Sequence, residues 1–323
     1  MMEDALKKFP DQFAYEPRIK HEENLRRSAK VIVAGMGGSH LAAGIVNAWK
    51  PALGIRVHRD YGLPPIPEDE LKDYLVVVIS YSGNTEEALD AFETARNKGL
   101  AIAAISVGGK LLERARIAEI PAVAIPDTGI QPRLALGFMT KALLAILDER
   151  EGMGEQGTLP VLLRQNDFEA AGAALAETLK GRVPVIYSSN RNEAVAYNWK
   201  IKFNETGKIP AFMNVLPEAN HNEMTGFDVI ESTKLLSQNF SFLLLTDTED
   251  HPRVQKRFRV LKEMYEARKL PVTVLELTGR NRFHKIFASL LAADWAAYHL
   301  ARHYGTEPEA VRMVEEFKKR MTK

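Results

Sequence analysis

The chain has 323 residues, of which 46% are hydrophobic and 26% are charged, a composition typical of soluble globular proteins. This length favours two domains of ordinary size over one large core. The formal net charge is +1, and no block of like charge indicates a nucleic acid as partner. The chain has no cysteine, which excludes disulfides, thiolate nucleophiles and cysteine-based metal sites.

No apolar run is long enough to span a bilayer, and the N-terminal residues lack the apolar stretch of a signal peptide. We therefore expect a soluble cytoplasmic protein that uses neither a membrane nor a nucleic acid as partner. A short, highly charged helical segment is expected first, over residues 3–8 and 17–30.

Strands and helices then alternate along both halves of the chain. In the first half we expect strands at 31–34, 55–61, 76–79, 101–106 and 121–126, and helices at 41–49, 86–98 and 134–147. In the second half we expect strands at 183–187, 240–245 and 271–277, a helix from Glu193 and a long helix at 284–301. This alternation predicts a doubly wound parallel sheet in each half.

A glycine-rich, polar stretch at 151–157 separates the two halves of the pattern. Such composition is typical of a domain boundary. We therefore place an N-terminal domain at 1–152 and a C-terminal domain at 153–323.

The strand at 76–79 leads into a turn that is rich in hydroxyl groups. Ser80, Ser82, Gly83 and Thr85 lie between this strand and the following helix. The N-terminus of a helix attracts anions, and hydroxyls add donors for a phosphate without adding a charge. The alternative is an ordinary turn in which Thr85 caps the helix.

A second turn of this kind follows the strand at 31–34, where Gly35, Gly37 and Gly38 precede Ser39. A dinucleotide fingerprint is disfavoured because His40 replaces its third glycine, and no Gly-Lys-Ser/Thr follows for a P-loop. Ligands of parallel sheets bind at the carboxyl ends of strands, where both turns lie. The sequence therefore predicts a site for a small phosphate ligand, with candidate residues Gly37, Gly38, Ser39, Ser80, Ser82 and Thr85.

Arg133 stands at the start of the helix at 134–147. A cation is slightly unfavourable at a helix N-terminus, so Arg133 is either a solvated charge or the partner of an anion. In the second half, the turn after the strand at 240–245 carries three carboxylates, Asp247, Glu249 and Asp250, which would repel phosphate. We therefore expect one phosphate site per chain, in the N-terminal half.

Two polar segments stand out in the second half. Glu205 ends a helical pattern, where a negative charge is unfavourable because it lies at the negative end of the helix dipole. We therefore expect Glu205 either to pair with Lys202 or to have a functional role. Asn220-His221-Asn222-Glu223 has no apolar periodicity and is expected to be a loop. His221 and Glu223 could be metal ligands, but a zinc site needs further ligands, and no metal is expected.

Five segments together resemble the bifunctional phosphoglucose/phosphomannose isomerases of archaea and bacteria. They are Gly35–Ser39, Ser80–Thr85, Gln131–Arg133, Asn204–Lys208 and Asn220–Glu223. That family is a branch of the phosphoglucose isomerase superfamily with two sugar-isomerase (SIS) domains. Ser-x-Ser-Gly-Asn-Thr marks phosphosugar SIS domains in general, whereas the last two segments narrow the resemblance to this branch. The resemblance runs from about Val31 to the end of the chain and implies two SIS domains, each an αβα sandwich around a parallel sheet.

The resemblance also implies roles for individual residues. The two hydroxyl turns would bind the substrate phosphate, Glu205 would be the catalytic base, and Arg133 would steady the enediolate. His221 would open the sugar ring, arriving from the partner subunit of a homodimer. A lysine near the C-terminus would line the site, and we choose Lys318 over Lys319.

The implied reaction converts glucose 6-phosphate, and mannose 6-phosphate as well, to fructose 6-phosphate. A proton moves between C1 and C2 through a cis-enediol, so one carboxylate can serve both carbons and no cofactor is needed. Some family members carry a threonine after the proline of the last helix, where this chain reads Glu307-Pro308-Glu309-Ala310. If that threonine helps to handle the mannose epimer, the resemblance supports the mannose activity less strongly than the glucose activity. Two alternatives stay open: another SIS phosphosugar isomerase, and a non-catalytic phosphosugar-binding regulator.

Overall fold

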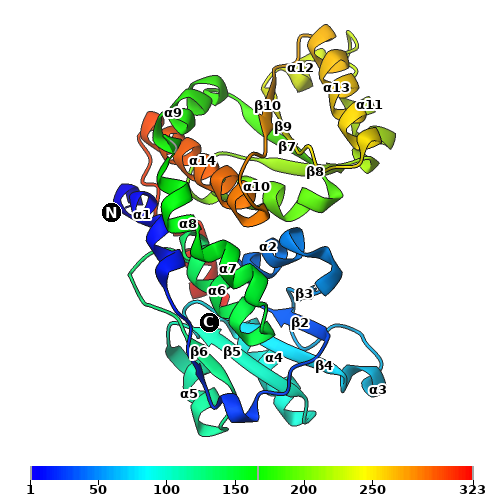
Figure 1. The fold of residues 1–323 in the computed structure, drawn as a ribbon. Helices are drawn as coiled ribbons and strands as arrows, with labels where there is room; N and C mark the ends of the chain where they lie inside the picture. Colours follow the sequence, from blue (N-terminus) through cyan, green and yellow to red (C-terminus); the bar gives the residue numbers. More distant parts are fainter. Residues whose placement is uncertain (1, 166, 322–323) are drawn as a thin grey trace. The chain divides into compact units, whose positions relative to one another are not determined.

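The computed structural model describes residues 2–165 and 167–321. The chain forms two compact units, each built on its own sheet (Figure 1). The N-terminal unit comprises Lys7–Gln165 and Arg280–His284, and the C-terminal unit comprises Met1–Leu6, Asn166–Gly279 and Lys285–Lys323. None of the helices in the described residues is both long enough and apolar enough to cross a lipid bilayer.

The sheet of the N-terminal unit has six strands in the order β1-β6-β5-β4-β2-β3. The strands are β1 (Ile19–Lys20), β2 (Lys30–Ala34), β3 (Arg56–His58), β4 (Tyr74–Ile79), β5 (Ala101–Ser106) and β6 (Ala122–Ala124). All neighbours pair in parallel except β1, which pairs antiparallel with β6 through Ile19 and Val123. The helix expected over 17–30 is therefore wrong, because this segment contributes an edge strand and the short 3₁₀ turn Glu22–Asn24.

Helices cover both faces of this sheet, as the alternating pattern predicts (Figure 1). They are α2 (Leu41–Trp49), α3 (Glu68–Leu71), α4 (Glu86–Asn97), α5 (Gly109–Ile117), α6 (Leu136–Leu147), α7 (Arg150–Gly157) and α8 (Leu159–Leu162). Every residue of β4 is buried, and alternate residues such as Val76 and Val78 pack against Ala91 and Phe92 of α4. Burial on both faces explains why these strands read as continuous apolar runs.

The glycine-rich stretch expected to separate the domains is helical and forms α7. A Cβ at Gly152 would lie 3.0 Å from Leu144 Cδ2 and from Trp49 Cη2, so this glycine serves close packing inside the N-terminal unit. The boundary expected between residues 152 and 153 thus falls inside a helix, and the units divide after Gln165.

The sheet of the C-terminal unit has four parallel strands in the order β10-β9-β7-β8. The strands are β7 (Val183–Ser189), β8 (Phe212–Leu216), β9 (Phe240–Thr246) and β10 (Val272–Glu276). The helices are α1 (Met2–Lys7), α9 (Phe168–Leu179), α10 (Glu193–Glu205), α11 (Glu223–Gly226), α12 (Lys234–Ser237), α13 (Pro252–Ala267), α14 (Arg282–His303) and α15 (Arg312–Met321). The sequence pattern does not predict β8, because this edge strand is only partly buried and carries the polar Asn214.

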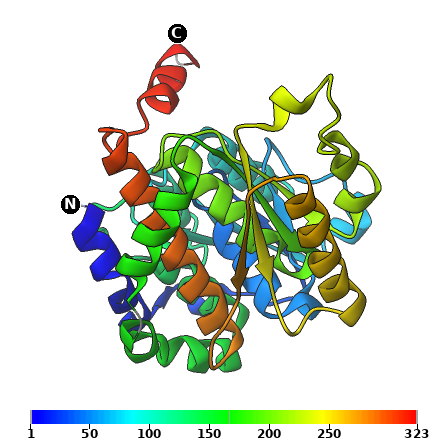
Figure 2. The same cartoon turned by 90° about the horizontal axis from the view of Figure 1, so that it is seen from above.

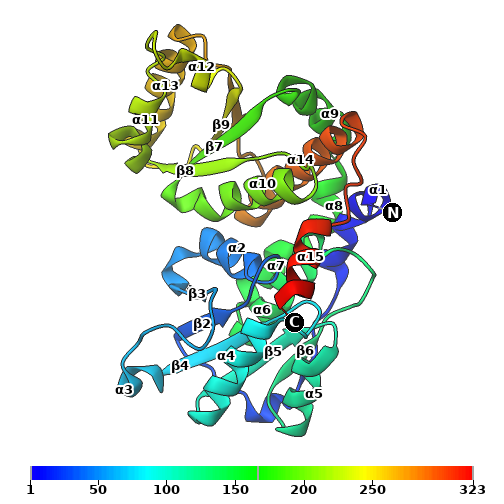
Figure 3. The same ribbon diagram turned by 180° about the vertical axis from the view of Figure 1, so that it is seen from behind.

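Helices lie on both faces of the second sheet as well, with α10 and α14 on one face and α13 on the other (Figure 3). The face toward α13 packs Val185 and Phe242 against Phe258 and Leu261. The N-terminal helix α1, the blue helix beside the N label in Figure 2, belongs to this unit up to Leu6. Tyr298 Oη of α14 donates to Glu3 Oε2 at 3.1 Å. Each unit is therefore an α/β sandwich around a parallel sheet, and the expected fold class is confirmed.

A buried ion pair joins α10 to α14. Lys202 Nζ lies 2.6 Å from Asp294 Oδ2, and the two side chains are only 2% and 1% exposed. Removing one partner of such a pair leaves an uncompensated charge in a low-dielectric interior, which costs more than removing both partners.

We expect Asp294→Ala to lower the free energy of unfolding by about 3–5 kcal/mol, because it leaves the Lys202 ammonium buried without its counter-ion. The double variant Lys202→Met/Asp294→Leu removes both charges and is expected to lose much less. Urea denaturation followed by circular dichroism measures both effects. A double variant that is destabilised as strongly as the single variant would contradict this prediction.

Candidate functional site

The two hydroxyl turns meet at one edge of the N-terminal sheet. Strands β2 and β4 are parallel neighbours, so their carboxyl ends lie at the same edge. Since β3 and β4 flank β2 on opposite sides, this is the point where the strand order reverses and where such folds bind ligands. The backbone N–H of Tyr81 donates to Ser39 Oγ at 2.9 Å, which joins the turn after β4 to the turn after β2.

The hydroxyls of the turn after β4 are arranged around the start of α4. Ser80 is fully buried, and its Oγ donates to Thr85 Oγ1 at 3.0 Å. Thr85 occupies the N-cap position of α4, but its side chain makes no capping hydrogen bond. The simple capping role is therefore not realised. Ser82 is exposed, and its Oγ accepts from Asn84 N at 3.3 Å.

The shape of this turn depends on Gly83. Its φ is +70°, and a Cβ added there would lie 1.9 Å from the carbonyl oxygen of Gly108. The start of α5 holds the turn from the other side, because Leu111 N donates to Gly83 O at 2.9 Å and Lys110 N donates to Asn84 Oδ1 at 3.2 Å. Only glycine fits this position, and the first turn of α5 fixes the turn that contains it.

Arg133 lies at the same edge. It belongs to the 3₁₀ turn Pro132–Leu134, which precedes α6, and it is 2% exposed. A Cβ at Gly38 would lie 2.7 Å from Arg133 N, so the absence of a side chain at Gly38 lets this turn pack directly on the turn after β2. Gly37, with φ +53°, adopts the left-handed conformation in the same turn. The structure thus brings Arg133 and both glycines to the hydroxyl turns.

His40 follows Ser39 and is buried. Burial, together with the nearby Arg59, lowers the pKa of His40 to about 4. The imidazole is therefore neutral at physiological pH and adds no positive charge to this edge.

In the C-terminal unit, Glu205 is the last residue of α10. The ammonium of Lys208 donates to the carbonyl oxygen of Glu205 and, at 2.5 Å, to that of Ala310. A lysine at this position satisfies a terminal carbonyl and complements the negative end of the helix dipole. Lys202, considered from the sequence as a partner for Glu205, forms the buried ion pair with Asp294. Lys208 is not among the individual site residues predicted from the sequence, although the segment Asn204–Lys208 contains it.

The segment expected to be a loop, residues 220–223, consists of a 3₁₀ turn, Glu218–His221, followed by the start of α11. Arg257 of α13 donates to Asn220 Oδ1 at 3.3 Å. Asn222 Oδ1 accepts from Glu223 N at 2.6 Å and so caps α11. Two of the four polar residues therefore fix the backbone of the segment.

Glu223 fixes the segment to the sheet. Its two carboxylate oxygens accept hydrogen bonds from Tyr187 Oη and Asn214 Nδ2, each at 2.6 Å. His221 is exposed, and among the described residues its side chain has neither a hydrogen-bond nor an ion-pair partner. Neutral donors thus hold the Glu223 carboxylate. In the described part of the chain, no group of three histidine, aspartate or glutamate side chains could hold a metal ion.

Lys318 lies on α15, where its ammonium forms an exposed ion pair with Glu315 at 3.1 Å. Lys319 lies on the same helix. The residues predicted from the sequence are therefore divided between the units. The hydroxyl turns and Arg133 belong to the N-terminal unit, and Glu205, His221 and Lys318 belong to the C-terminal unit.

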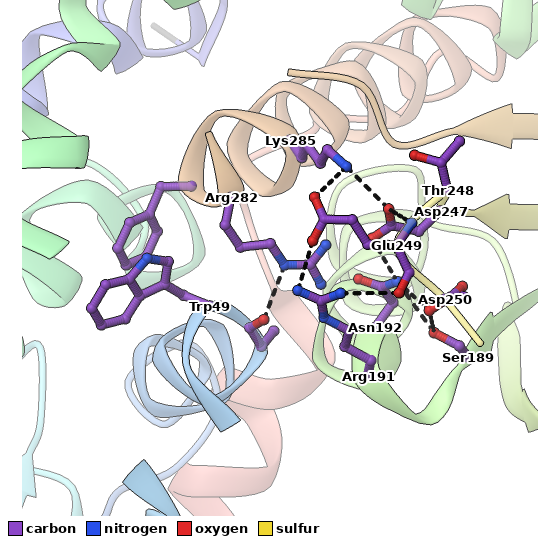
Figure 4. A network of polar contacts seen from close by, with 12 residues as sticks. Trp49, Ser189, Arg191, Asn192, Asp247, Thr248, Glu249, Asp250, Arg282 and Lys285 are labelled. Atoms are coloured by element: carbon purple, nitrogen blue, oxygen red, sulfur yellow. Dashed lines mark hydrogen bonds and ion pairs between the residues drawn. The ribbon is translucent and has the colours of Figure 1, made fainter. Parts of the chain in front are cut away.

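The second sheet has its own reversal point, between β7 and β9. Figure 4 shows the polar network of this region, which includes Ser189 and Asp250. Ser189 Oγ donates to Asp250 Oδ1 at 2.6 Å. Lys285 Nζ lies 3.2 Å from Asp247 Oδ1 and 2.6 Å from Glu249 Oε1. The three carboxylates noted in the sequence thus interact with groups of their own unit, in an arrangement unlike the hydroxyl turns of the first sheet.

Comparison with known proteins agrees with this architecture. Residues 168–321 match the family model of the bacterial phospho-glucose isomerase C-terminal SIS domain. Among solved structures, the C-terminal domain of glucosamine-fructose-6-phosphate aminotransferase from Francisella tularensis superimposes with a TM-score of 0.71 at 16% identity, over 96% of this chain and 98% of that chain. At this identity the likeness concerns the fold alone.

Relatives of known name align over nearly the whole chain. A bifunctional phosphoglucose/phosphomannose isomerase from Aquifex aeolicus is 34% identical over 98% of this chain and 96% of its own length. Another, from Caldicellulosiruptor bescii, is 32% identical over 99% of this chain and 98% of its own length. The chain therefore belongs to the bifunctional phosphoglucose/phosphomannose isomerase family, as its sequence motifs indicate.

Proposed function

We propose that this protein interconverts glucose 6-phosphate and fructose 6-phosphate, and acts on mannose 6-phosphate as well, as an enzyme of sugar metabolism in the cytoplasm. One observation carries the proposal: a hydrogen bond of 2.9 Å from Tyr81 N to Ser39 Oγ joins the two hydroxyl turns. The buried Arg133 lies beside them. Neutral donors and a helix N-terminus suit a phosphate monoester. The names of the relatives point to the same substrates.

Within this proposal, the hydroxyl turns and the glycines beside them hold the phosphate, with Gly37, Gly38, Ser39, Ser80, Ser82 and Thr85 as its contacts. The phosphate is remote from the reacting carbons, so its binding energy can position the sugar. Glu205 removes the proton from C2 of the open-chain aldose and returns it to C1, through a cis-enediol. Arg133 stabilises the negative charge that develops on oxygen. No hydride moves, so the reaction needs no nicotinamide, and no metal is invoked.

Hexose phosphates are mostly cyclic, so the ring must open before the proton transfer. We assign this step to His221, because histidine is the side chain that most often acts as a general acid or base. Its exposed side chain, without a polar partner among the described residues, is consistent with a role in a neighbouring subunit. The proposal therefore includes a homodimer in which each subunit supplies His221 to its partner, and Lys318 as a further site residue.

The same base can serve both epimers. Glucose 6-phosphate and mannose 6-phosphate differ only at C2 and give the same enediol. A rotation about the C2–C3 bond before proton transfer would present either C2 proton to Glu205.

A coupled assay for fructose 6-phosphate, without added metal, tests the activity directly. Formation of fructose 6-phosphate from glucose 6-phosphate supports the proposal. Binding of the sugar phosphate without turnover would favour a phosphosugar-binding regulator, and turnover of a different phosphosugar alone would favour another SIS isomerase.

We expect Glu205→Gln to lower kcat for glucose 6-phosphate and for mannose 6-phosphate alike, by about 10²–10⁴-fold, because the amide cannot accept the proton. The KM for each substrate should change little, since the glutamine side chain keeps the size of the glutamate side chain. Steady-state kinetics with each substrate measures this. If mannose 6-phosphate turnover survives while glucose 6-phosphate turnover is lost, two bases are involved.

We expect Thr85→Val to raise the KM for glucose 6-phosphate about 10-fold or more, because it removes one hydrogen bond to a charged group, worth about 1.5–3 kcal/mol. The substitution preserves shape and breaks no capping bond, and the one internal hydrogen bond that it removes among the described residues is the bond from Ser80 Oγ. Thr248→Val, in the turn after β9, is the matched control and should leave the KM unchanged. An equal effect of the two substitutions would place the phosphate elsewhere.

A further inference from the structure

Glu223 bridges two neighbouring strands of the second sheet. Tyr187 of β7 and Asn214 of β8 are direct partners in the parallel ladder, and each donates one 2.6 Å hydrogen bond to the Glu223 carboxylate. Glu223 lies two residues after His221 and begins α11. The carboxylate therefore attaches the segment that carries His221 to β7 and β8, through the paired residues Tyr187 and Asn214.

The Tyr187 donor is itself immobilised. Its side chain is 1% exposed and packs against Phe242, with ring centroids 5.8 Å apart. Burial raises the pKa of Tyr187, so the phenol stays protonated and donates to the carboxylate. Hydrogen bonds to an ionised acceptor are about twice as strong as neutral ones. The attachment of Glu223 is thus short, charge-assisted and built on a rigid strand.

The other side of the segment is fixed as well. Arg257 donates to Asn220, and Asn222 caps α11, so polar contacts flank His221 on both sides. Among the described residues, the imidazole of His221 contacts none of these groups through a hydrogen bond or ion pair. The segment is therefore a fixed support that presents an exposed imidazole.

We propose that Glu223, held by Tyr187 and Asn214, is a positioning residue that sets the orientation of His221 for ring opening. This inference rests on the proposed function, because it takes His221 as the ring-opening group. Glu223 itself does not touch the sugar: its two carboxylate oxygens are directed at the two strands. A displacement of a catalytic group by about 1 Å can cost as much as 10²-fold in rate.

The alternative is that Glu223 only stabilises the fold. A stabilising role would lower the melting temperature of a variant, but its effect on turnover would not depend on His221. A positioning role predicts that the effect disappears once His221 is absent, since residues that act as one unit are strongly non-additive.

The test is a double-mutant cycle on the full-length protein, with Glu223→Gln and Tyr187→Phe made alone and combined with His221→Ala. Each single variant keeps the size of its side chain, and circular dichroism checks that each is folded. We expect each to lower kcat for glucose 6-phosphate about 10-fold, with KM changed by less than about twofold. In the His221→Ala background, neither substitution should lower kcat further.

Tyr265→Phe is the matched control. It removes a hydroxyl 3.5 Å from that of Tyr187, in the same buried cluster, while the bonds to Glu223 remain. Its kcat should equal that of the unsubstituted protein.

Two results would overturn the proposal: an unchanged kcat of Glu223→Gln, or an equal loss with and without His221. Full activity of His221→Ala would overturn the assigned role of His221 together with this inference. A strong loss in His221→Ala beside an unaffected Glu223→Gln would overturn the inference alone.

Discussion

The hydrogen bond from Tyr81 N to Ser39 Oγ joins the two turns on which the proposed phosphate site depends. It forms because β2 and β4 are parallel neighbours whose carboxyl ends lie at the same edge. Backbone packing then completes the arrangement, since Gly38 lets the Arg133 turn approach and Gly83 lets the β5 loop approach. The result is a set of hydroxyls beside the buried Arg133, with the His40 imidazole kept neutral by burial. The two hydroxyl turns themselves contain no carboxylate.

The two units share a fold but have developed opposite chemistry at the corresponding edge. In the second sheet, Asp247 and Glu249 pair with Lys285, and Asp250 accepts from Ser189. Carboxylates at this edge would repel a phosphate. The C-terminal unit instead supplies Glu205 at a helix end and His221 on a fixed segment. In the proposed function, the two halves of this duplicated architecture divide phosphate binding and proton transfer between them.

The strongly apolar strands and their following turns could be predicted from the sequence because burial on both faces leaves a continuous signal, as in β4 and β5. The partly exposed strand β8 and the two-residue strand β1 leave no such signal. Each is recognised as a strand only through its pairing with a strand elsewhere in the chain, β7 for β8 and β6 for β1. Glycine content indicated a linker at 151–157, whereas Gly152 serves helix packing. The family resemblance drew attention to Glu223, but its bond to Tyr187 spans 36 residues and became visible only in the fold.

The lack of room at Gly83 has an evolutionary consequence. Any side chain there would collide with the Gly108 carbonyl, and a side chain at Gly38 would collide with the Arg133 backbone. These two positions of the proposed phosphate site are therefore closed to gradual change by substitution.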